Sequence, residues 1–180
     1  MKILKGILFL IIGIVVLVLI VALFVKKEYA VEREISINKP KAEVFNYIKF
    51  LKNQDSYSVW AKRDPNMKKE YKGVDGTVGF ISAWDSENKE VGKGEQEIKK
   101  IAAGERIDFE LRFIKPFEAT DTAYMTTEPI VDNQTKVKWG FRGKMKYPMN
   151  LMLIAMNMDK MLGNDLQTGL VNLKKNLEAK

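Results

Sequence analysis

The chain has 180 residues, which is room for one domain of about 150 residues and a short additional segment. Hydrophobic residues make up 46% of it, so the composition is that of a folded protein rather than a disordered one. It has no cysteine and no histidine, which excludes disulfides, Cys/His zinc sites, thiol nucleophiles and catalytic triads with an imidazole base. Carboxylates remain available for acid/base chemistry, but their spacing predicts no metal site, and we predict no cofactor.

The N-terminal region has the composition of a membrane anchor. From Gly6 to Val25 there are 20 residues without a charge, nearly all Ile, Leu, Val or Phe. A helix rises about 1.5 Å per residue, so this run would cover the hydrocarbon core of a bilayer, about 30 Å. Lys2 and Lys5 precede the run, and Lys26 and Lys27 follow it. A cleaved signal peptide is the alternative, but its apolar core is shorter, about 7–15 residues, and no Ala-x-Ala-like site follows.

We therefore predict two parts, a single-pass anchor over residues 1–27 and a folded domain over residues 28–180. Lysines flank both ends of the apolar run, so the charges alone hardly decide the orientation. Translocating the cationic N-terminal tail is the harder event, which favours a domain on the extracytoplasmic side. Without the four anchor lysines the domain has 26 cations and 23 anions, a net charge of +3. This charge gives little support for nucleic-acid binding, and no nucleic-acid partner is predicted.

The domain is predicted to begin with a strand and two short helices. Apolar and charged side chains alternate from Val31 to Ile37, which is typical of a strand with one covered face. Pro40 then suits the first turn of a helix, and an apolar stripe follows from Val44 to Leu51. A second short helix or loop is expected over residues 53–60.

Residues 67–145 are predicted to form antiparallel strands joined by polar turns. Residues 107–113 and 136–145 alternate most regularly between apolar and charged side chains. Turn signals at 73–76, 85–89, 103–104 and 132–134 separate the strands.

The C-terminal region predicts a long amphipathic helix. Apolar residues recur every three or four positions from Leu151 to Leu177. We expect a kink or interruption at Gly163. A curved antiparallel sheet covered by this helix is the simplest packing for such an order of elements.

Six segments within residues 29–180 carry a resemblance to a known superfamily. They are EREISINKPKAEVFNYI (32–48), the stretch around Trp60, GTVGFISAWDS (76–86), VGKGEQEIKKI (91–101), GERIDFELRFIKPFE (104–118) and DLQTGLVNLKKNLE (165–178). These segments resemble the START/Bet v 1-like (SRPBCC) superfamily. More closely, they resemble its membrane-anchored bacterial members, which are named polyketide cyclase/dehydrase and lipid-transport family proteins.

The resemblance implies an α+β helix-grip fold, here preceded by one transmembrane helix. In this fold a curved antiparallel sheet of about seven strands and two short helices grip a long C-terminal helix. The resemblance also implies an apolar cavity between sheet and helix. Members of the superfamily hold sterols, lipids, hormones or aromatic polyketides there, and some act as enzymes or co-chaperones.

Aromatic and methionine side chains are the candidates for a ligand-binding wall. The sheet aromatics should mostly face inward, where core and cavity wall overlap. Six of nine methionines fall between Met145 and Met161, and flexible thioethers adapt to varied apolar shapes. The same segment also suits an ordinary core helix or contact with the bilayer surface. The predicted ligand-binding residues are Phe80, Trp84, Phe109, Phe113, Tyr124, Trp139, Phe141, Met149, Met152 and Met156.

Polar patterns assign no catalytic group. The carboxylates Asp64, Glu70, Glu95, Glu97 and Asp108 are scattered, and exposed positions explain them better than acid/base work does. A cationic row on one strand predicts a solvated face or, alternatively, contact with anionic headgroups: Lys136, Lys138, Arg142, Lys144 and Lys146. Gly92 and Gly94, if they face inward, would leave space in the cavity wall.

We predict membrane-tethered binding of a hydrophobic small molecule or lipid in the cavity. A polyketide cyclase/dehydratase-like enzyme is the first alternative, and it requires a cavity-facing ionisable group with a perturbed pKa. A protein-interaction module is the second alternative, and it predicts a filled core with an exposed apolar patch. The predicted partners are therefore an apolar small molecule or lipid and, through the N-terminal helix, the membrane.

Overall fold

Helices at both ends of the chain flank a run of strands. The computed structural model describes residues 2–179. Its elements are α1 (Lys2–Phe24), β1 (Glu28–Ile37), α2 (Lys41–Ile48), α3 (Leu51–Tyr57), α4 (Val59–Arg63), β2 (Lys68–Lys72), β3 (Ile81–Asp85), β4 (Lys93–Ala102), β5 (Arg106–Lys115), β6 (Ala119–Val131), β7 (Gln134–Lys144), the 3-10 helix η1 (Met149–Leu151), α5 (Met152–Ala155) and α6 (Met158–Glu178). The predicted order of strand, short helices, strands and long helix is confirmed.

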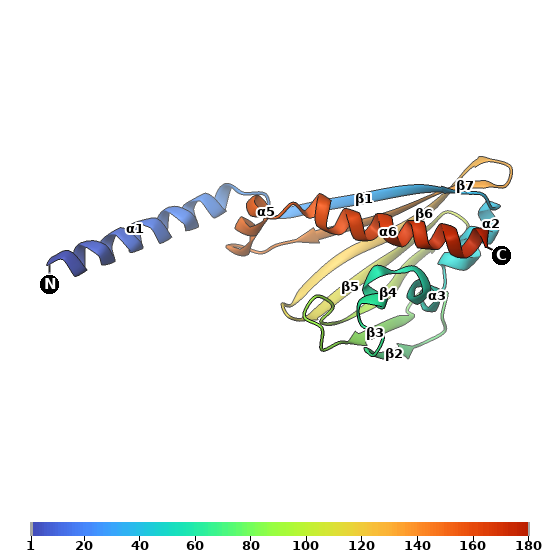
Figure 1. Cartoon of the computed structure of the whole chain (residues 1–180), viewed down its shortest axis with the longest axis horizontal. Helices are drawn as coiled ribbons and strands as arrows, with labels where there is room; N and C mark the ends of the chain where they lie inside the picture. Colours follow the sequence, from blue (N-terminus) through green and yellow to red (C-terminus); the bar gives the residue numbers. More distant parts are fainter. Residues whose placement is uncertain (1, 180) are drawn as a thin grey trace.

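The seven strands form one antiparallel sheet in the order β1-β7-β6-β5-β4-β3-β2. The sheet is curved, and α6 lies against it beside β1 (Figure 1). The short helices α3 and α4 pack against α6 and close the space between the helix and the far strands. This arrangement leaves one face of the sheet covered and the other open to solvent.

Alternation along β7 determines which face is covered. Val137, Trp139 and Phe141 are buried on the inner face. Lys136 and Lys138 project from the outer face, where their Nζ atoms lie 3.7 and 3.2 Å from carboxylate oxygens of Glu34 and Glu128. The predicted cationic row therefore lies on the solvent face, and neighbouring acids neutralise part of its charge.

The long helix begins later than its apolar periodicity predicts. Helix α6 starts at Met158, because the side chain of Asn157 accepts a hydrogen bond from the backbone N–H of Lys160 at 2.9 Å and caps the helix there. Met156, just before the cap, is extended and ends α5. The expected interruption at Gly163 is wrong, since α6 runs unbroken to Glu178.

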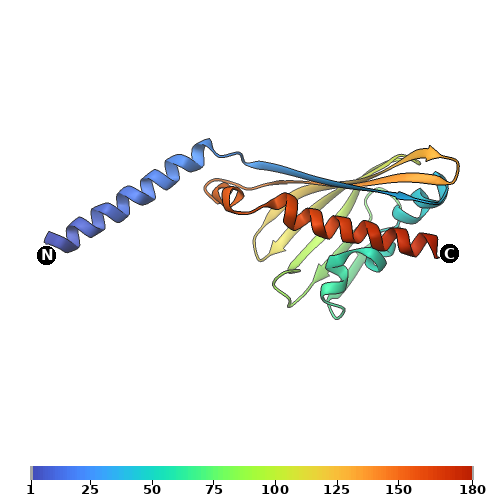
Figure 2. The ribbon, with the colours of Figure 1, turned by 45° about the horizontal axis from the view of Figure 1, so that its top comes forward.

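Helix α1 projects away from the domain (Figures 1 and 2). Residues 3–24 are long and apolar enough to cross a membrane, by length and composition, and nearly all of their side chains are exposed. Its C-terminal end is fixed to the connection between β7 and α6. Asn150 Nδ2 donates hydrogen bonds to the carbonyl oxygens of Ala22 and Val25, at 2.7 and 3.0 Å, and the Tyr147 hydroxyl donates one to that of Leu19 at 3.3 Å.

Candidate functional site

A cavity of about 340 Å³ lies between the inner face of the sheet, helices α3 and α4, and α6. All three tryptophans of the chain belong to its wall. The apolar lining residues are Leu51, Trp60, Ala61, Met67, Ala83, Trp84, Val91, Leu111, Phe113, Ala123, Trp139, Phe141, Leu162 and Leu166. An apolar molecule placed here would leave water for hydrocarbon and aromatic surface, which is favourable by about 25 cal/mol per Å² buried.

Edge-to-face contacts hold the tryptophan rings of the wall in place. The ring centroids of Trp60 and Trp139 lie 6.2 Å apart, and those of Trp84 and Phe113 lie 6.0 Å apart. Gly94 faces inward on β4 opposite Trp84, and a Cβ at Gly94 would lie only 2.6 Å from Cζ2 of Trp84. Gly94 therefore seats the Trp84 ring, and the expectation that it leaves empty space is wrong.

Asp121 is the buried carboxylate of the cavity wall. It lies on the inner face of β6, two residues before Ala123, and is only 7% exposed. The backbone pairing between β6 and β7 starts at Thr122 and Arg142. Beyond this pair, the Asp121 carboxylate accepts a hydrogen bond from the backbone N–H of Lys144 at 3.1 Å. Burial raises the pKa of the Asp121 carboxyl, and this hydrogen bond offsets part of the shift.

Tyr29 of β1 lines the cavity on the same side as Asp121. Its ring stacks on Phe141 with the centroids 6.1 Å apart. Burial, and secondly the negative charge of Asp121, raise the pKa of the Tyr29 hydroxyl far above its usual range. The hydroxyl therefore stays protonated and can donate a hydrogen bond at physiological pH.

Lys69 is the cation of the cavity lining, and it is already paired. Its Nζ lies 2.5 Å from Oδ1 of Asp55, while the Tyr71 hydroxyl donates a hydrogen bond to Oδ2 of Asp55 at 2.8 Å. Burial, and then this hydrogen bond, raise the pKa of Tyr71 to about 12. The described lining residues include three carboxylates and one cation, and their net charge is therefore negative. The carboxylates are those of Asp55, Glu90 and Asp121, and the cation is Lys69.

The structure brings together four of the ten predicted ligand-binding residues. Trp84, Phe113, Trp139 and Phe141 line the cavity. Phe80 and Phe109 are buried at 1% and 2% exposure on the inner face, but they belong to the packed core beyond the cavity wall.

The expected position of Tyr124 in the cavity wall is corrected by its strand register. Tyr124 lies on the outer face of β6, where its ring covers Gly140 of β7. Its hydroxyl donates a hydrogen bond to the Glu32 carboxylate, and the Arg106 guanidinium stacks 4.0 Å from the ring centroid. Its neighbour Ala123 faces the cavity instead.

The three predicted methionines also lie outside the cavity wall. Met149, Met152 and Met156 belong to η1, α5 and the residue after it, next to the end of α1. Met149 and Met152 are 48% and 39% exposed. This exposure does not fit the core-helix alternative for the segment.

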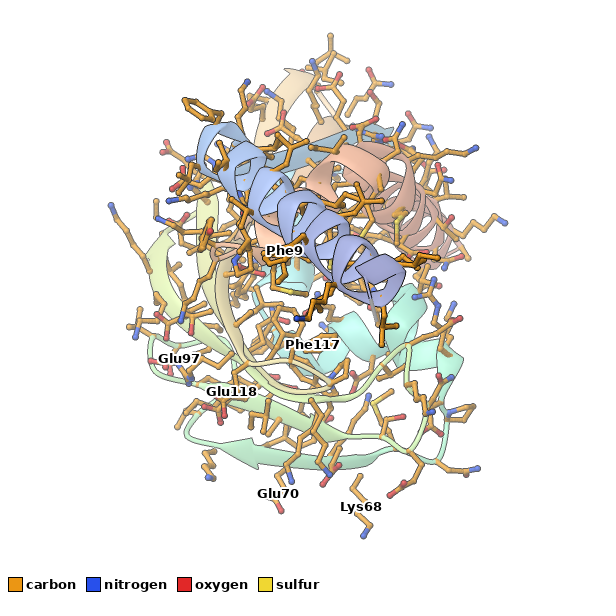
Figure 3. The ribbon with its side chains drawn as sticks, turned by 90° about the vertical axis from the view of Figure 1, so that its left-hand side faces the viewer. Phe9, Lys68, Glu70, Glu97, Phe117 and Glu118 are labelled. Atoms are coloured by element: carbon orange, nitrogen blue, oxygen red, sulfur yellow. The ribbon has the colours of Figure 1, made fainter. Side chains whose placement is uncertain are left out.

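Asp121 and Tyr29 were not among the predicted site residues. The sequence carried one signal for them, the alternation of strand residues between two faces. Asp121 is two residues from Ala123 and four from Met125, and Tyr29 is two residues from Val31, so each lies on the same face as these apolar residues. Of the scattered carboxylates, Glu95 and Glu97 lie on the outer face but are partly buried rather than exposed, and both form ion pairs with Arg112, at 2.6 and 2.7 Å. Glu97 and Glu70 point outward in Figure 3.

The architecture is similar to that of several solved proteins. No family model matches the chain, and no curated protein matches its sequence. Norcoclaurine synthase from Thalictrum flavum, solved with dopamine and hydroxybenzaldehyde, has a TM-score of 0.62 at 12% identity, over 85% of this chain and 88% of that one. A protein from Nitrosospira multiformis has a TM-score of 0.59 at 16% identity, over 83% and 96%.

Ara h 8.0201 is a third similar structure, with a TM-score of 0.58 at 14% identity, over 85% of this chain and 99% of that one. The chain has a Bet v 1-like fold. Within this helix-grip fold, α6 is the gripped helix, and the cavity lies between it and the sheet. At these sequence identities the similarity establishes the fold and leaves the activity to be argued from the site itself.

Proposed function

We propose that this chain binds a compact apolar molecule, neutral or cationic, in the cavity beneath α6, and that α1 holds the cavity at a membrane. The observation that carries the proposal is the apolar cavity of about 340 Å³ with three tryptophans in its wall. This volume is at the lower end of the range for ligand pockets, about 300–1,000 Å³. It suits a molecule with one or two rings or a short chain better than a lipid with two acyl chains.

The charges of the wall support a preference against anions. Lys69 is neutralised by Asp55, and Asp121 accepts only a backbone N–H among the contacts that the described residues make with it. A ligand carboxylate near Asp121 would bring two negative charges together in a poorly solvated place. An ammonium or hydroxyl group there would instead donate a hydrogen bond to the Asp121 carboxylate.

The membrane part of the proposal rests on α1. An exposed, predominantly apolar helix of 22 residues is stable against water only if lipid or another apolar partner covers it. We propose residues 1–27 as the retained anchor and residues 28–180 as the folded domain, on the extracytoplasmic side. The short connection from α1 to β1 would keep the cavity close to molecules dissolved in the bilayer.

A cyclase- or dehydratase-like enzyme is the second candidate, and the buried Asp121 favours it. With a raised pKa and the neighbouring Tyr29 hydroxyl, Asp121 is the candidate general base of such an enzyme. A protein-interaction module predicts a core without a cavity, and the open volume beneath α6 does not fit it.

Tryptophan fluorescence tests ligand binding directly, because all three tryptophans line the cavity. The full chain in nanodiscs would be titrated with three compounds that differ in one group: 4-phenylbutanol, 4-phenylbutylamine and 4-phenylbutanoate. We expect saturable changes in emission with the alcohol and the amine, and binding of the carboxylate weaker by about tenfold or more, since repulsion of about 1.4 kcal/mol suffices for that. No saturable change with any of the three would contradict the proposal.

A further inference from the structure

We propose that, at the end of the domain from which α1 leaves, two loops insert exposed apolar side chains into the bilayer interface: the connection of residues 147–156 and the β5–β6 turn of residues 114–118. The inference rests on the proposed membrane-spanning role of α1 and goes beyond it. It makes the domain itself a peripheral membrane-binding surface with a fixed orientation.

The strand register brings the two loops to the same end of the sheet. Glu28 at the start of β1 pairs with Lys144 at the end of β7. On the neighbouring strands, Phe113 near the end of β5 pairs with Ala119 at the start of β6. The turn after β5, the segment after β7 and the end of α1 therefore share one end of the domain, and Figure 1 shows α5 and the near end of the sheet on the side of α1.

The first loop is attached to α1 at membrane depth. The Tyr147 hydroxyl bonds to the carbonyl of Leu19, which lies six residues before Val25 and therefore about 9 Å along the helix. A bilayer that covers α1 up to its last turn would reach the Tyr147 side chain as well. Met152 and Ile154, which follow, are 39% and 65% exposed in the structure.

The second loop belongs to a different part of the chain, and its apolar Phe117 lies between the exposed charged residues Lys115 and Glu118, which suits insertion at the headgroup level. Phe117 is 70% exposed and Ile114 is 46% exposed. Figure 3 views the molecule from the side of α1, with Phe117 and Glu118 labelled below the helix. Exposed apolar residues on two separate loops at one end of a domain form a contact surface.

A bilayer fits this surface better than a protein partner does, because the surface is continuous with α1. The loop of Tyr147 and Asn150 contacts the last turns of α1, so whatever covers these turns also covers the loop. Lys26, Lys27 and Lys146 lie on the same edge and are exposed, as cations at the level of lipid headgroups are.

The absence of native cysteine allows single-cysteine labelling of the full chain. We would label Phe117→Cys and Met152→Cys with the fluorophore NBD, and reconstitute each variant into nanodiscs that contain lipids with a doxyl quencher. Val131→Cys is the matched control, because Val131 is 64% exposed at the β6–β7 hairpin on the opposite end of the sheet. Leu10→Cys reports separately on α1.

We expect the labels at 117 and 152 to be quenched about threefold more strongly than the label at 131, because interfacial side chains reach the lipid-borne quencher. Quenching at 10 with only background quenching at 117 or 152 would overturn the inference and leave the anchor intact. Background quenching at all four positions would overturn the membrane part of the proposed function itself.

Discussion

Gly163 of α6 lies directly against the guanidinium of Arg33 on β1: a Cβ at position 163 would be 2.0 Å from Nη2 of Arg33. The guanidinium crosses this glycine to reach Asp159, and its Nη1 and Nη2 lie 2.9 Å from the two carboxylate oxygens. This bidentate pair ties the first turn of α6 to the edge strand of the sheet. Gly163 therefore leaves α6 uninterrupted, and its lack of a side chain makes room for the Arg33 guanidinium.

Substituting Gly163 by alanine should change the free energy of unfolding little. The added methyl group displaces the partly exposed Arg33 guanidinium from Asp159, a loss of about 0–1 kcal/mol that offsets the gain in helix propensity. In an Arg33→Ala background the same substitution should stabilise the chain by up to about 1 kcal/mol, since alanine favours a helix over glycine. Thermal unfolding of the four chains of this cycle measures both effects. A gain of the same size in both backgrounds would contradict the contact.

Asp121→Asn should raise the melting temperature at neutral pH by a few degrees, about 2–4 °C for each kcal/mol in a chain of this size. The amide oxygen can still accept the Lys144 N–H, while the buried charge is removed. Burial raises the pKa of the wild-type carboxyl, so wild-type stability falls as the pH rises from about 4 through that raised pKa.

Melting temperatures of wild type and Asp121→Asn between pH 3.5 and 8 test this sign. The difference should be small at the acid end, where the carboxyl is protonated in both the folded and unfolded states. A wild-type advantage that grows with pH would mean that the charge stabilises the fold. In the ligand titration, the same variant should lose its preference for the amine over the carboxylate and still bind the alcohol.

Ala123→Leu should fill part of the cavity and weaken binding of 4-phenylbutanol by about tenfold or more, because larger side chains in the wall take the volume that the ligand needs. Ala123 is 5% exposed on the inner face of β6, between Phe109 and Phe141 on the neighbouring strands. Ala30→Leu, on the exposed outer side of β1, is the matched control. Isothermal titration calorimetry measures the affinity of each folded variant for 4-phenylbutanol. An unchanged affinity in Ala123→Leu would mean that the ligand binds outside this cavity.

Asn150→Ala should loosen the end of α1 from the domain. The side chain is fully buried and donates to two carbonyl oxygens, that of Ala22 in the last turn of α1 and that of Val25 just after it. Leaving such groups unpaired costs about 1–3 kcal/mol. Hydrogen exchange of the full chain in nanodiscs should then speed up about tenfold at residues 20–27 and 145–156. Asn164→Ala, on the exposed side of α6, should leave these segments unchanged.

Periodicity predicted most of the fold, because one covered face imposes a repeat of two on strands and of about 3.6 on helices. The alternation of Val137, Trp139 and Phe141 therefore placed the inner face of β7 correctly. The start of α6 was misplaced because Asn157 caps the helix within an apolar run that looks continuous in sequence.

The site was harder to predict, because its members depend on contacts between distant segments. In β6, small and polar residues dominate both faces, so the apolar alternation is weak, and only the parity with Ala123 and Met125 indicates that Asp121 faces inward. The methionines of residues 149–156 look like a cavity wall until their docking partner, the end of α1, is known. Four of the predicted aromatic residues line the cavity, because aromatic side chains on the covered face of a sheet surround any volume that the face encloses.

The central claim is that a ligand occupies the volume beneath α6, and intermolecular NOEs test it most directly. The full chain in nanodiscs, with labelled Ala, Leu and Met methyl groups, would be measured with 4-phenylbutanol. We predict NOEs from the ligand to the methyl groups of Ala123 and Leu111, which line the cavity. NOEs confined to Met149 and Met152 at the end of α1 would contradict the claim.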